Sequence, residues 1–579
     1  ADALRVHRDV TRELGIRLGM HYSGVLDARA VELHPEWSAI DAEGNPIWRT
    51  TCRLGAYERE LMIPQLVELI DRYDVDGFWV DGDNWGARPC WCERCRDEYT
   101  RRTGNGGAPL GPDDPHWREW LDFHRDLFVE YVTRCAEAVH ARKADCLYCS
   151  NWMYTLRQPE AVTAPVDYLS GDFMPNWGAQ RAALETRFMQ ARGLSWDLMA
   201  WGFTFNQTDG RGPAIMKPAT MLCQELSEVL AQGGASMVYM KPRRSGWLVG
   251  WEHEILAQVA DFCRARREAS FATESASEAA VLHLAEAYYR RNSPLFNYGS
   301  AIRPVEGALH ALLETGRTAD VVARDRVDTD LDRYRLVVLP QQEPLDDDLV
   351  ARLTAFAEGG GWVVASGDAL SRHLPEFVGA DPDGEPSDKR IALESGDRAI
   401  QLMPSWQRVT PREGTDVVRR RLVGVDPVKG LTDDVVITRR RVGRGGVLGI
   451  HGPVFANYFL GHNPSLRTLF AELIDDLDID WSLRVEAPWW LEASRRTKDG
   501  RTIVHLANRS AGHGLNDDRT IVESIPPVED VRLELALAQR PTDVRPAPAG
   551  APLDWSWRRG RLRVRVPRVE IHLAVVVEE

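Results

Sequence analysis

The chain has 579 residues, enough for roughly three to four domains, and 44% of them are hydrophobic and 27% charged. These proportions are typical of a soluble protein, and no run of about eighteen apolar residues could span a membrane. A net charge of −15 without a marked basic patch argues against nucleic acid as a partner. The nine cysteines, an odd number at irregular spacings, favour a reducing compartment, and we expect a cytoplasmic location.

The first 270 residues alternate between helical and strand patterns, which predicts parallel βα units. Six segments read as strands: 16–23, 77–82, 146–152, 166–173, 195–203 and 235–240. A (β/α)8 TIM barrel needs eight strands. Because residues 1–14 already read as a helix, we expect the first two barrel strands to be missing from this chain. Residues 77–82 would then be the fourth strand.

Two further domains are predicted after a polar linker at 271–277. Residues 278–480 form a second α/β pattern of buried strands and helices, and residues 482–579 read as short alternating strands, as in a small β-sandwich. Pro567 is expected to break the last run of alternation into two strands. The predicted domains are therefore 1–270, 278–480 and 482–579.

The sequence GFWVDGDNW at residues 77–85 joins a buried strand to an acidic, glycine-broken turn. Parallel strands present their chemistry at the carboxyl end, where Asp81 stands between flanking tryptophans. Indole faces stack on sugar rings, and a carboxylate can attack an anomeric carbon, so we interpret Asp81 as the nucleophile of a glycosidase. The structural alternative is that Asp81 only caps the next helix.

Three features together resemble the α-L-fucosidase-type glycoside hydrolases, in particular families 29 and 151 and the hypothetical glycosyl hydrolase group 6. They are GMHYSG at 19–24, GFWVDG at 77–82 followed by CWCERC at 90–95, and the order of the three domains. The middle domain resembles class I amidotransferases in shape, but residues 280–480 contain no cysteine for such a reaction. The domain order is also similar to that of family 42 β-galactosidases, whose middle domain forms a trimer. The resemblance therefore implies α-L-fucoside hydrolysis and a homo-oligomer, either a dimer or a trimer.

A fucosidase of this type uses an aspartate at the end of its fourth strand as the nucleophile, and the resemblance assigns that role to Asp81. A retaining enzyme also needs an acid/base carboxyl about 5–5.5 Å away. Asp172, in the sequence LSGDF, is our candidate, although related proteins carry glutamate there. Asp83, Glu225 and Glu252 are the alternatives.

Several polar and aromatic residues at or near predicted strand ends are candidates for binding the sugar. They are His21, Tyr22, Trp79, Trp85, Asn151, Trp201, Lys217 and Glu225. Each has a structural alternative, since core tryptophans, a satisfied buried histidine and a helix-packing glutamate are common.

The CWCERC sequence places Cys90, Cys92 and Cys95 close together, a set that suits tetrahedral zinc with a fourth ligand from elsewhere. Family 42 enzymes have a similar motif with one distant upstream cysteine, so the resemblance makes Cys52 the fourth ligand. Such a site would be structural, and we expect catalysis to need no cofactor. The alternative is a set of reduced cysteines without metal.

We therefore predict a retaining exo-glycosidase that acts on an oligosaccharide or glycoside, with terminal α-L-fucosides as the expected substrates. A β-galactosidase or arabinosidase of the same architecture is one alternative. A catalytically inactive carbohydrate-binding protein is the other.

Overall fold

A computed structural model describes residues 2–172, 178–205, 214–291, 295–296, 300–510 and 521–579. The chain forms two compact units. Unit 1 comprises Ala1–Gly171, Leu194–Trp196 and Tyr289–Ser300, and unit 2 comprises Asp172–Gly193, Asp197–Tyr288 and Ala301–Glu579. Among the helices of the described residues, none is both long enough and apolar enough to cross a bilayer. The three-domain division stays a prediction.

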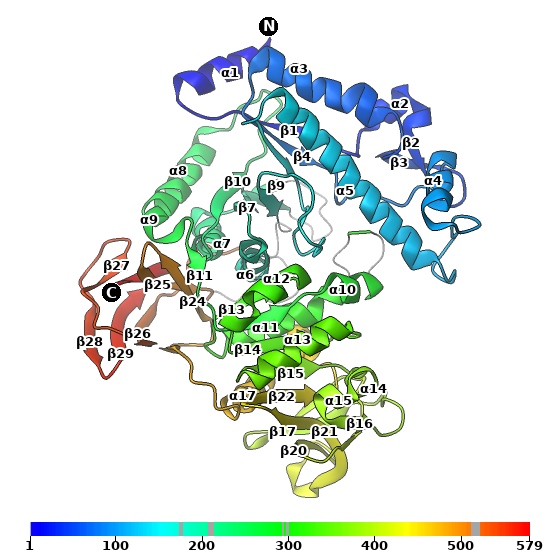
Figure 1. Cartoon of the computed structure of the whole chain (residues 1–579). Coiled ribbons are helices and arrows are strands. Elements are labelled where there is room, and N and C mark those ends of the chain that lie inside the picture. Colours follow the sequence, from blue (N-terminus) through cyan, green and yellow to red (C-terminus); the bar gives the residue numbers. More distant parts are fainter. Residues whose placement is uncertain (1, 173–177, 206–213, 292–294, 297–299, 511–520) are drawn as a thin grey trace. The chain divides into compact units, whose positions relative to one another are not determined.

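Unit 1 is built on a parallel sheet with the strand order β1-β4-β5. Its strands are β1 (Gly19–Ser23), β4 (Gly77–Asp81) and β5 (Leu147–Ser150). The helices α3 (Ile63–Tyr73) and α5 (Trp117–Arg142) run side by side along this sheet (Figure 1), and α1 (Ala3–Glu13) packs on α3. The three strands and α1 match the predicted strands 16–23, 77–82 and 146–152 and the predicted helix 1–14 to within a few residues at each end.

The central strand β4 has two different faces because successive side chains alternate. Phe78 and Val80 are buried, as are Leu66 on α3 and Val132 on α5. Burial of each such side chain contributes about 1.5–3 kcal/mol to folding. Trp79 and Asp81, on the opposite face, stay partly exposed, so this face is available for chemistry.

The connection after β1 contains regular structure. It holds α2 (Ala28–Leu33), β2 (Ser38–Ile40) and β3 (Pro46–Thr51), and the two strands pair in an antiparallel hairpin. A further helix, α4 (Glu93–Thr103), starts inside the CWCERC motif. Asp27 starts α2 by accepting a hydrogen bond from the backbone of Ala30, a local cap that the sequence reading overlooked.

The N-terminal part of unit 2 contains two parallel strands, β7 (Trp196–Trp201) and β10 (Ala235–Tyr239). Their pairing runs from Asp197 opposite Ala235 to Trp201 opposite Tyr239. Three helices accompany them: α6 (Gly178–Met189), α7 (Ala219–Ala231) and α8 (Gly250–Arg264). The order of these strands and helices along the chain agrees with the alternation predicted from the sequence. The predicted strand 166–173 corresponds to β6 (Leu169–Asp172), and Phe173 is outside the described residues.

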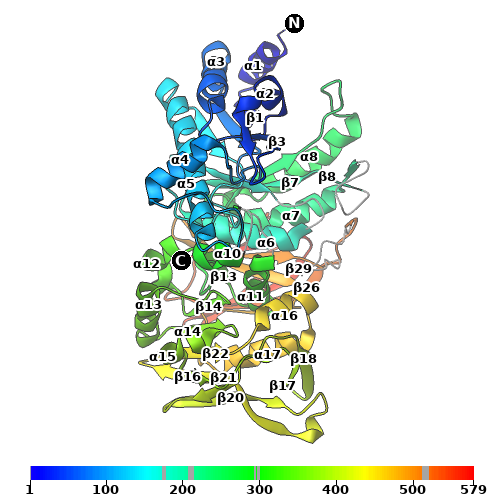
Figure 2. The ribbon, with the colours of Figure 1, turned by 90° about the vertical axis from the view of Figure 1, so that its right-hand side faces the viewer.

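The middle of unit 2 is a mixed sheet whose parallel core has the order β13-β12-β14-β15-β22. These strands are β12 (Ala279–Leu282), β13 (Ala319–Val322), β14 (Leu336–Pro340), β15 (Trp362–Ser366) and β22 (Gly445–Ile450). The long strand β21 (Leu431–Val442) continues the sheet antiparallel to β22 and pairs with β20 (Thr415–Leu422), as Figure 2 shows. The sequence predicted the parallel core but not this antiparallel extension.

The C-terminal part of unit 2 contains two antiparallel sheets with the orders β11-β24-β25-β30-β27 and β23-β26-β29-β28. The strands of the first sheet are β11 (Glu274–Ser275), β24 (Leu491–Lys498), β25 (Arg501–Asn508), β30 (His572–Glu578) and β27 (Asp543–Ala547). The second sheet includes β23 (Leu483–Glu486) and β28 (Asp554–Arg558). Their inward side chains form one apolar cluster that includes Val504, Leu533 and Val564. The prediction for Pro567 was wrong, because β29 (Arg561–Val569) continues through it. The register with the partner strand β26 (Val528–Ala536) is the same on both sides of this proline, and Asp530 opposite it has a positive φ of 55°.

Candidate active site

The register of the sheet in unit 1 brings the predicted nucleophile and histidine to one face. His21 pairs with Trp79 and Ser23 pairs with Asp81, while Asn151 follows directly after β5. Residues paired across parallel strands project to the same side of the sheet. His21, Trp79 and Asp81 therefore share the partly exposed face of β4.

The Asp81 carboxylate is held by three side chains. Its Oδ1 accepts hydrogen bonds from Trp85 Nε1 at 2.9 Å and from Asn151 Nδ2 at 3.1 Å. Its Oδ2 lies 3.6 Å from His21 Nε2, and the side chain keeps 31% of its surface exposed. One oxygen is thus fixed by neutral donors, whereas the other faces a titratable ring.

These contacts keep Asp81 ionised. Burial of the carboxyl alone would raise its pKa, but the hydrogen bonds from His21, Trp85, Asn151 and the Gly82 backbone outweigh it and lower the pKa to about 2. A glycosidase nucleophile must carry its negative charge at working pH. Asp81 meets that requirement and remains accessible.

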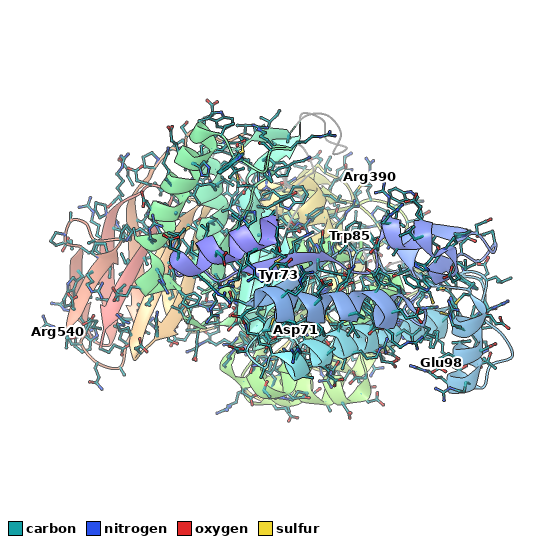
Figure 3. The ribbon with its side chains drawn as sticks, turned by 90° about the horizontal axis from the view of Figure 1, so that it is seen from above. Asp71, Tyr73, Trp85, Glu98, Arg390 and Arg540 are labelled. Atoms are coloured by element: carbon teal, nitrogen blue, oxygen red, sulfur yellow. The ribbon has the colours of Figure 1, made fainter. Side chains whose placement is uncertain are left out.

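Aromatic side chains surround this carboxylate. The His21 ring stacks on Trp79 with centroids 5.4 Å apart, and the Trp79 indole donates to Ser170 Oγ at 2.8 Å. Trp85, labelled in Figure 3, keeps 42% of its surface exposed while its N–H is held by Asp81. Its ring face is therefore free to stack on a sugar. Ser170 was not predicted, although its place in the LSGD sequence before a strand end could have indicated it.

Tyr22 is not part of this group, which corrects its prediction as a sugar-binding residue. It pairs with Val80, whose side chain is on the buried face of β4, and its hydroxyl donates to Gln65 of α3 at 2.5 Å. Burial, the largest effect, raises its pKa well above the usual value. Tyr22 therefore packs the sheet against its helices.

Asp83 lies two residues after Asp81 but in the opposite environment. It is completely buried, and its oxygens accept from the backbone N–H of Val25 and from Ser150 Oγ, both at 3.0 Å. Burial raises its pKa to about 7. The approach to the neighbouring loop is so close that a Cβ on Gly24 would lie 1.5 Å from Asp83 Oδ1. Asp83 thus fastens the loop after β1 and is not a rival for the acid/base role.

Asp172 and Trp201 are the last residues of two strands. Asp172 closes β6 and is buried to 9% exposure. Trp201 closes β7, is partly exposed and packs against Phe203 and Tyr239, with ring centroids 5.3 Å apart in both pairs. Both residues have the strand-end positions that the sequence predicted.

Lys217 and Glu225, two predicted sugar-binding residues, form an ion pair with each other. Lys217 Nζ lies 2.8 and 3.0 Å from the two Glu225 oxygens, and both side chains are fully buried. Burial lowers the pKa of Lys217 and raises that of Glu225. A buried pair of this kind is a structural element, so the packing alternative replaces their sugar-binding prediction. Glu252 also has a structural role at the start of α8. Its carboxylate accepts hydrogen bonds from the backbone N–H of Val249 and from the Arg243 guanidinium, each at 2.9 Å.

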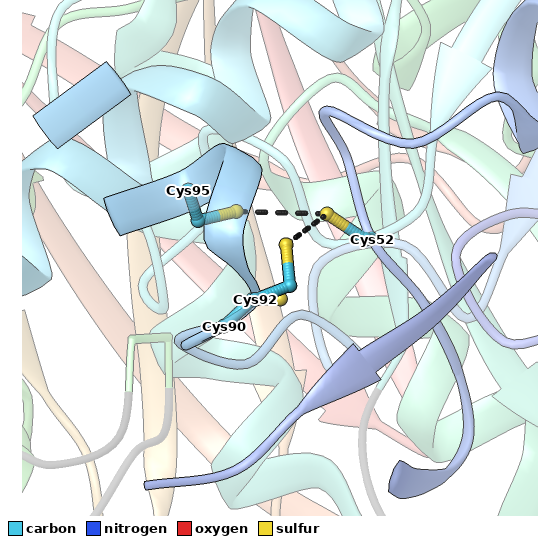
Figure 4. A group of neighbouring side chains, drawn as sticks. All are labelled: Cys52, Cys90, Cys92 and Cys95. Atoms are coloured by element: carbon cyan, nitrogen blue, oxygen red, sulfur yellow. Dashed lines mark hydrogen bonds between the residues drawn. The ribbon is translucent and has the colours of Figure 1, made fainter. Parts of the chain in front are cut away.

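Four cysteines from two distant segments converge in unit 1 (Figure 4). The Cys52 sulfur lies 3.6 Å from that of Cys92 and 3.5 Å from that of Cys95, and Cys90 completes a group whose sulfurs all lie within 4.8 Å of one another. Four sulfurs around zinc at about 2.3 Å would be about 3.8 Å apart. The spacing of the thiols therefore suits a closed tetrahedral site, and none of them forms a disulfide.

Comparisons with known proteins point to the same chemistry as the site. The family model described as alpha-L-fucosidase matches residues 1–268, and the model described as beta-galactosidase trimerisation domain matches residues 304–368. Among curated protein sequences, no relative matches this chain.

Solved structures share the fold over nearly all of the chain. The α-L-fucosidase isoenzyme 2 from Paenibacillus thiaminolyticus is 21% identical in sequence and superposes with a TM-score of 0.82. The alignment covers 100% of this chain and 90% of the fucosidase chain. A β-galactosidase from Bacillus circulans sp. alkalophilus has 14% identity, a TM-score of 0.71 and coverages of 99% and 91%. The β-galactosidase from Halorubrum lacusprofundi has 16% identity, a TM-score of 0.69 and coverages of 100% and 91%.

The protein is a glycoside hydrolase of α/β architecture, with a TIM-barrel-like N-terminal part and a β-rich C-terminal part. Within it, residues 1–268 match the alpha-L-fucosidase family domain, and residues 304–368 match the beta-galactosidase trimerisation domain. The resemblance deduced from the sequence is thereby confirmed.

Proposed function

We propose that this glycoside hydrolase is a retaining exo-glycosidase of terminal α-L-fucosides and that Asp81 is its nucleophile. One observation carries the assignment: an ionised, partly exposed carboxylate at the end of β4 has one oxygen fixed by Trp85 and Asn151. A nucleophile needs a charged oxygen aimed along one direction, and fixed donors supply that aim without moving during the reaction.

In the proposed reaction, Asp81 attacks the anomeric carbon while the acid/base carboxyl protonates the departing oxygen. The bond from carbon to the leaving oxygen breaks as the bond to Asp81 forms, which gives a glycosyl ester. Water, deprotonated by the same acid/base group, then attacks that carbon and frees Asp81. His21, 3.6 Å from Asp81, is placed to bind a sugar hydroxyl next to the reacting carbon, and Trp85 offers a stacking face.

For the acid/base role we propose Asp172, on the basis of its position at the end of β6. Its rivals have lost support: Asp83 is tied to the loop after β1, Glu225 is paired with Lys217 and Glu252 caps α8. For sugar contacts beyond Asp81, we propose Trp201 as a second stacking residue because it is partly exposed at the end of β7.

The sugar can be tested with a panel of 4-nitrophenyl glycosides. Cleavage of the α-L-fucoside at least tenfold faster than of the β-D-galactoside and α-L-arabinoside supports the proposed specificity. The alternative, a β-galactosidase, is favoured by the trimerisation domain at residues 304–368 and predicts the reverse order. A fluorinated fucosyl fluoride that traps the ester intermediate should label the peptide containing Asp81, and labelling elsewhere would refute the assignment.

We also propose a structural zinc ion held by Cys52, Cys90, Cys92 and Cys95, whose mutual distances fit a tetrahedral thiolate shell. The ion would join the β3 end to the start of α4 and take no part in catalysis. The trimerisation domain supports a homo-oligomer and favours a trimer over a dimer. Nine cysteines without a disulfide support a reducing location such as the cytoplasm.

A further inference from the structure

Unit 2 contains a pocket of about 490 Å³ that the glycosidase chemistry does not use. We call it the linker pocket because the linker segment Ser275–Glu278 forms one wall. Arg333 and Arg335, which precede β14, form a second wall, and Ser482 and Arg495 with the end of β26 form the third. Segments far apart in the sequence thus meet around one cavity within this unit.

The two carboxylates of the linker pocket are already engaged by protein groups. Glu278 is buried and accepts from the backbone N–H of Ser482 at 3.0 Å, in addition to its ion pair with Arg335 Nε at 2.8 Å. Asp320, behind the pocket, is fully buried, pairs with Arg333 at 2.7 Å and accepts from Ser275 Oγ at 2.9 Å. The pocket lining thus contains three guanidinium groups and one carboxylate, with Asp320 behind it and Glu579 also attracting the charge of Arg495.

Arg495 makes no direct ion pair among the described residues. Its Nη1 donates to Ser482 Oγ at 2.5 Å, and its Nε is buried without a hydrogen-bond partner among the described residues. Within the same described residues, Glu278 and Glu579 attract its charge from beyond ion-pair distance, and Arg335 repels it. Burial, the largest effect, lowers the pKa of Arg495 although these carboxylates oppose it.

We propose that the linker pocket binds a small anionic molecule through a phosphate or sulfate group. Guanidinium groups offer planar forks of donors that match the oxygens of such groups, and Arg495 and Arg335 supply two of them beside the Ser277 and Ser482 hydroxyls. The volume is within the range of about 300–1,000 Å³ found for small-molecule sites, so the anion can carry a sugar-sized body.

Binding should stabilise the fold because one ligand would contact the linker, the segment before β14 and the sheet that contains β24. A ligand that binds only the folded state raises the unfolding temperature in proportion to the logarithm of its concentration. Two kinds of ligand could supply the charged group: a free inorganic anion or a phosphorylated sugar. They differ only in whether a sugar is attached to that group.

The test uses the full-length protein with inorganic phosphate, sulfate, glucose 6-phosphate and glucose, each at the same ionic strength set with sodium chloride. We expect a saturable rise in Tm of about 1–2 °C and saturable calorimetric heat with phosphate or sulfate. Glucose should give neither effect. Tighter binding of glucose 6-phosphate than of phosphate would identify a phosphorylated sugar, and equal binding would identify the free anion.

The variants Arg495→Gln and Arg335→Gln should each weaken phosphate binding at least tenfold. Arg563→Gln is the matched control, since Arg563 is an exposed arginine paired with a single glutamate at 2.8 Å outside the pocket. If Arg495→Gln fails to fold, the 45% exposed Arg335 provides the decisive variant. The absence of saturable phosphate and sulfate binding to the wild type, or equal binding by the Arg335 variant and the control, would overturn the proposal.

Discussion

Asp81 and Asp83 are two carboxyl groups separated by one residue, and the structure predicts opposite results when each becomes asparagine. Asparagine keeps the size and shape of the side chain but removes its charge. Asp81→Asn should lower kcat by about 10³-fold or more, because an amide cannot form the glycosyl ester. Asp83→Asn should leave kcat within about tenfold, since an amide can still accept from Val25 and bond Ser150.

The magnitude for stability follows from the pKa of Asp81. A fall from 3.8 to about 2 is about 1.8 units, which at about 1.36 kcal/mol per unit gives about 2.4 kcal/mol at most. Partial exposure of the side chain reduces this to about 1–2 kcal/mol. Because the folded pKa is lowered, this stabilisation is present above pH 3.8 and is lost as the pH falls through about 2.

The assay combines 4-nitrophenyl α-L-fucoside hydrolysis with urea unfolding of both variants at pH 7. Asp81→Asn should be inactive yet folded, and less stable than the wild type by the stated amount. Retention of more than a tenth of the wild-type kcat by Asp81→Asn would refute the nucleophile assignment. Inactivation of a well-folded Asp83→Asn variant to the same degree would refute the distinction between the two carboxyls.

Three further results are expected. The pKa of Asp83 is raised to about 7, so the stabilisation from its protonated form is complete below pH 3.8 and is lost as the pH rises through about 7. The Tm of Asp83→Asn should therefore exceed that of the wild type at pH 8 but not at pH 4. A Tm difference between variant and wild type that is the same at both pH values would contradict this. Mass spectrometry of metals should find one zinc per chain in the wild type and about none in Cys92→Ser, with a lower Tm, and a zinc-free wild type would refute the site. Asp172→Gly should lose activity on poor leaving groups and regain it with azide as a glycosyl azide of retained configuration, whereas unaltered activity would exclude Asp172 as the acid/base group.

The sequence alone determined the features that depend on neighbouring residues. The apolar run ending in Asp81 predicted a buried strand and the exposed end of that strand, because a parallel strand has a fixed direction and period. The same period places His21 and Tyr22 on opposite faces, so the error for Tyr22 could have been avoided from the sequence. The clustered thiols of the CWCERC motif were likewise visible as a metal-site pattern.

The tertiary structure decided what each polar group meets after folding. Nothing local distinguishes Asp81 from Asp83, yet one carboxyl is ionised among donors and the other is buried with its pKa near 7. Lys217 and Glu225 became an internal ion pair for the same reason. Solvation and charge partners are set by segments distant in the chain, and they control pKa and availability, which a pattern of neighbouring residues does not contain.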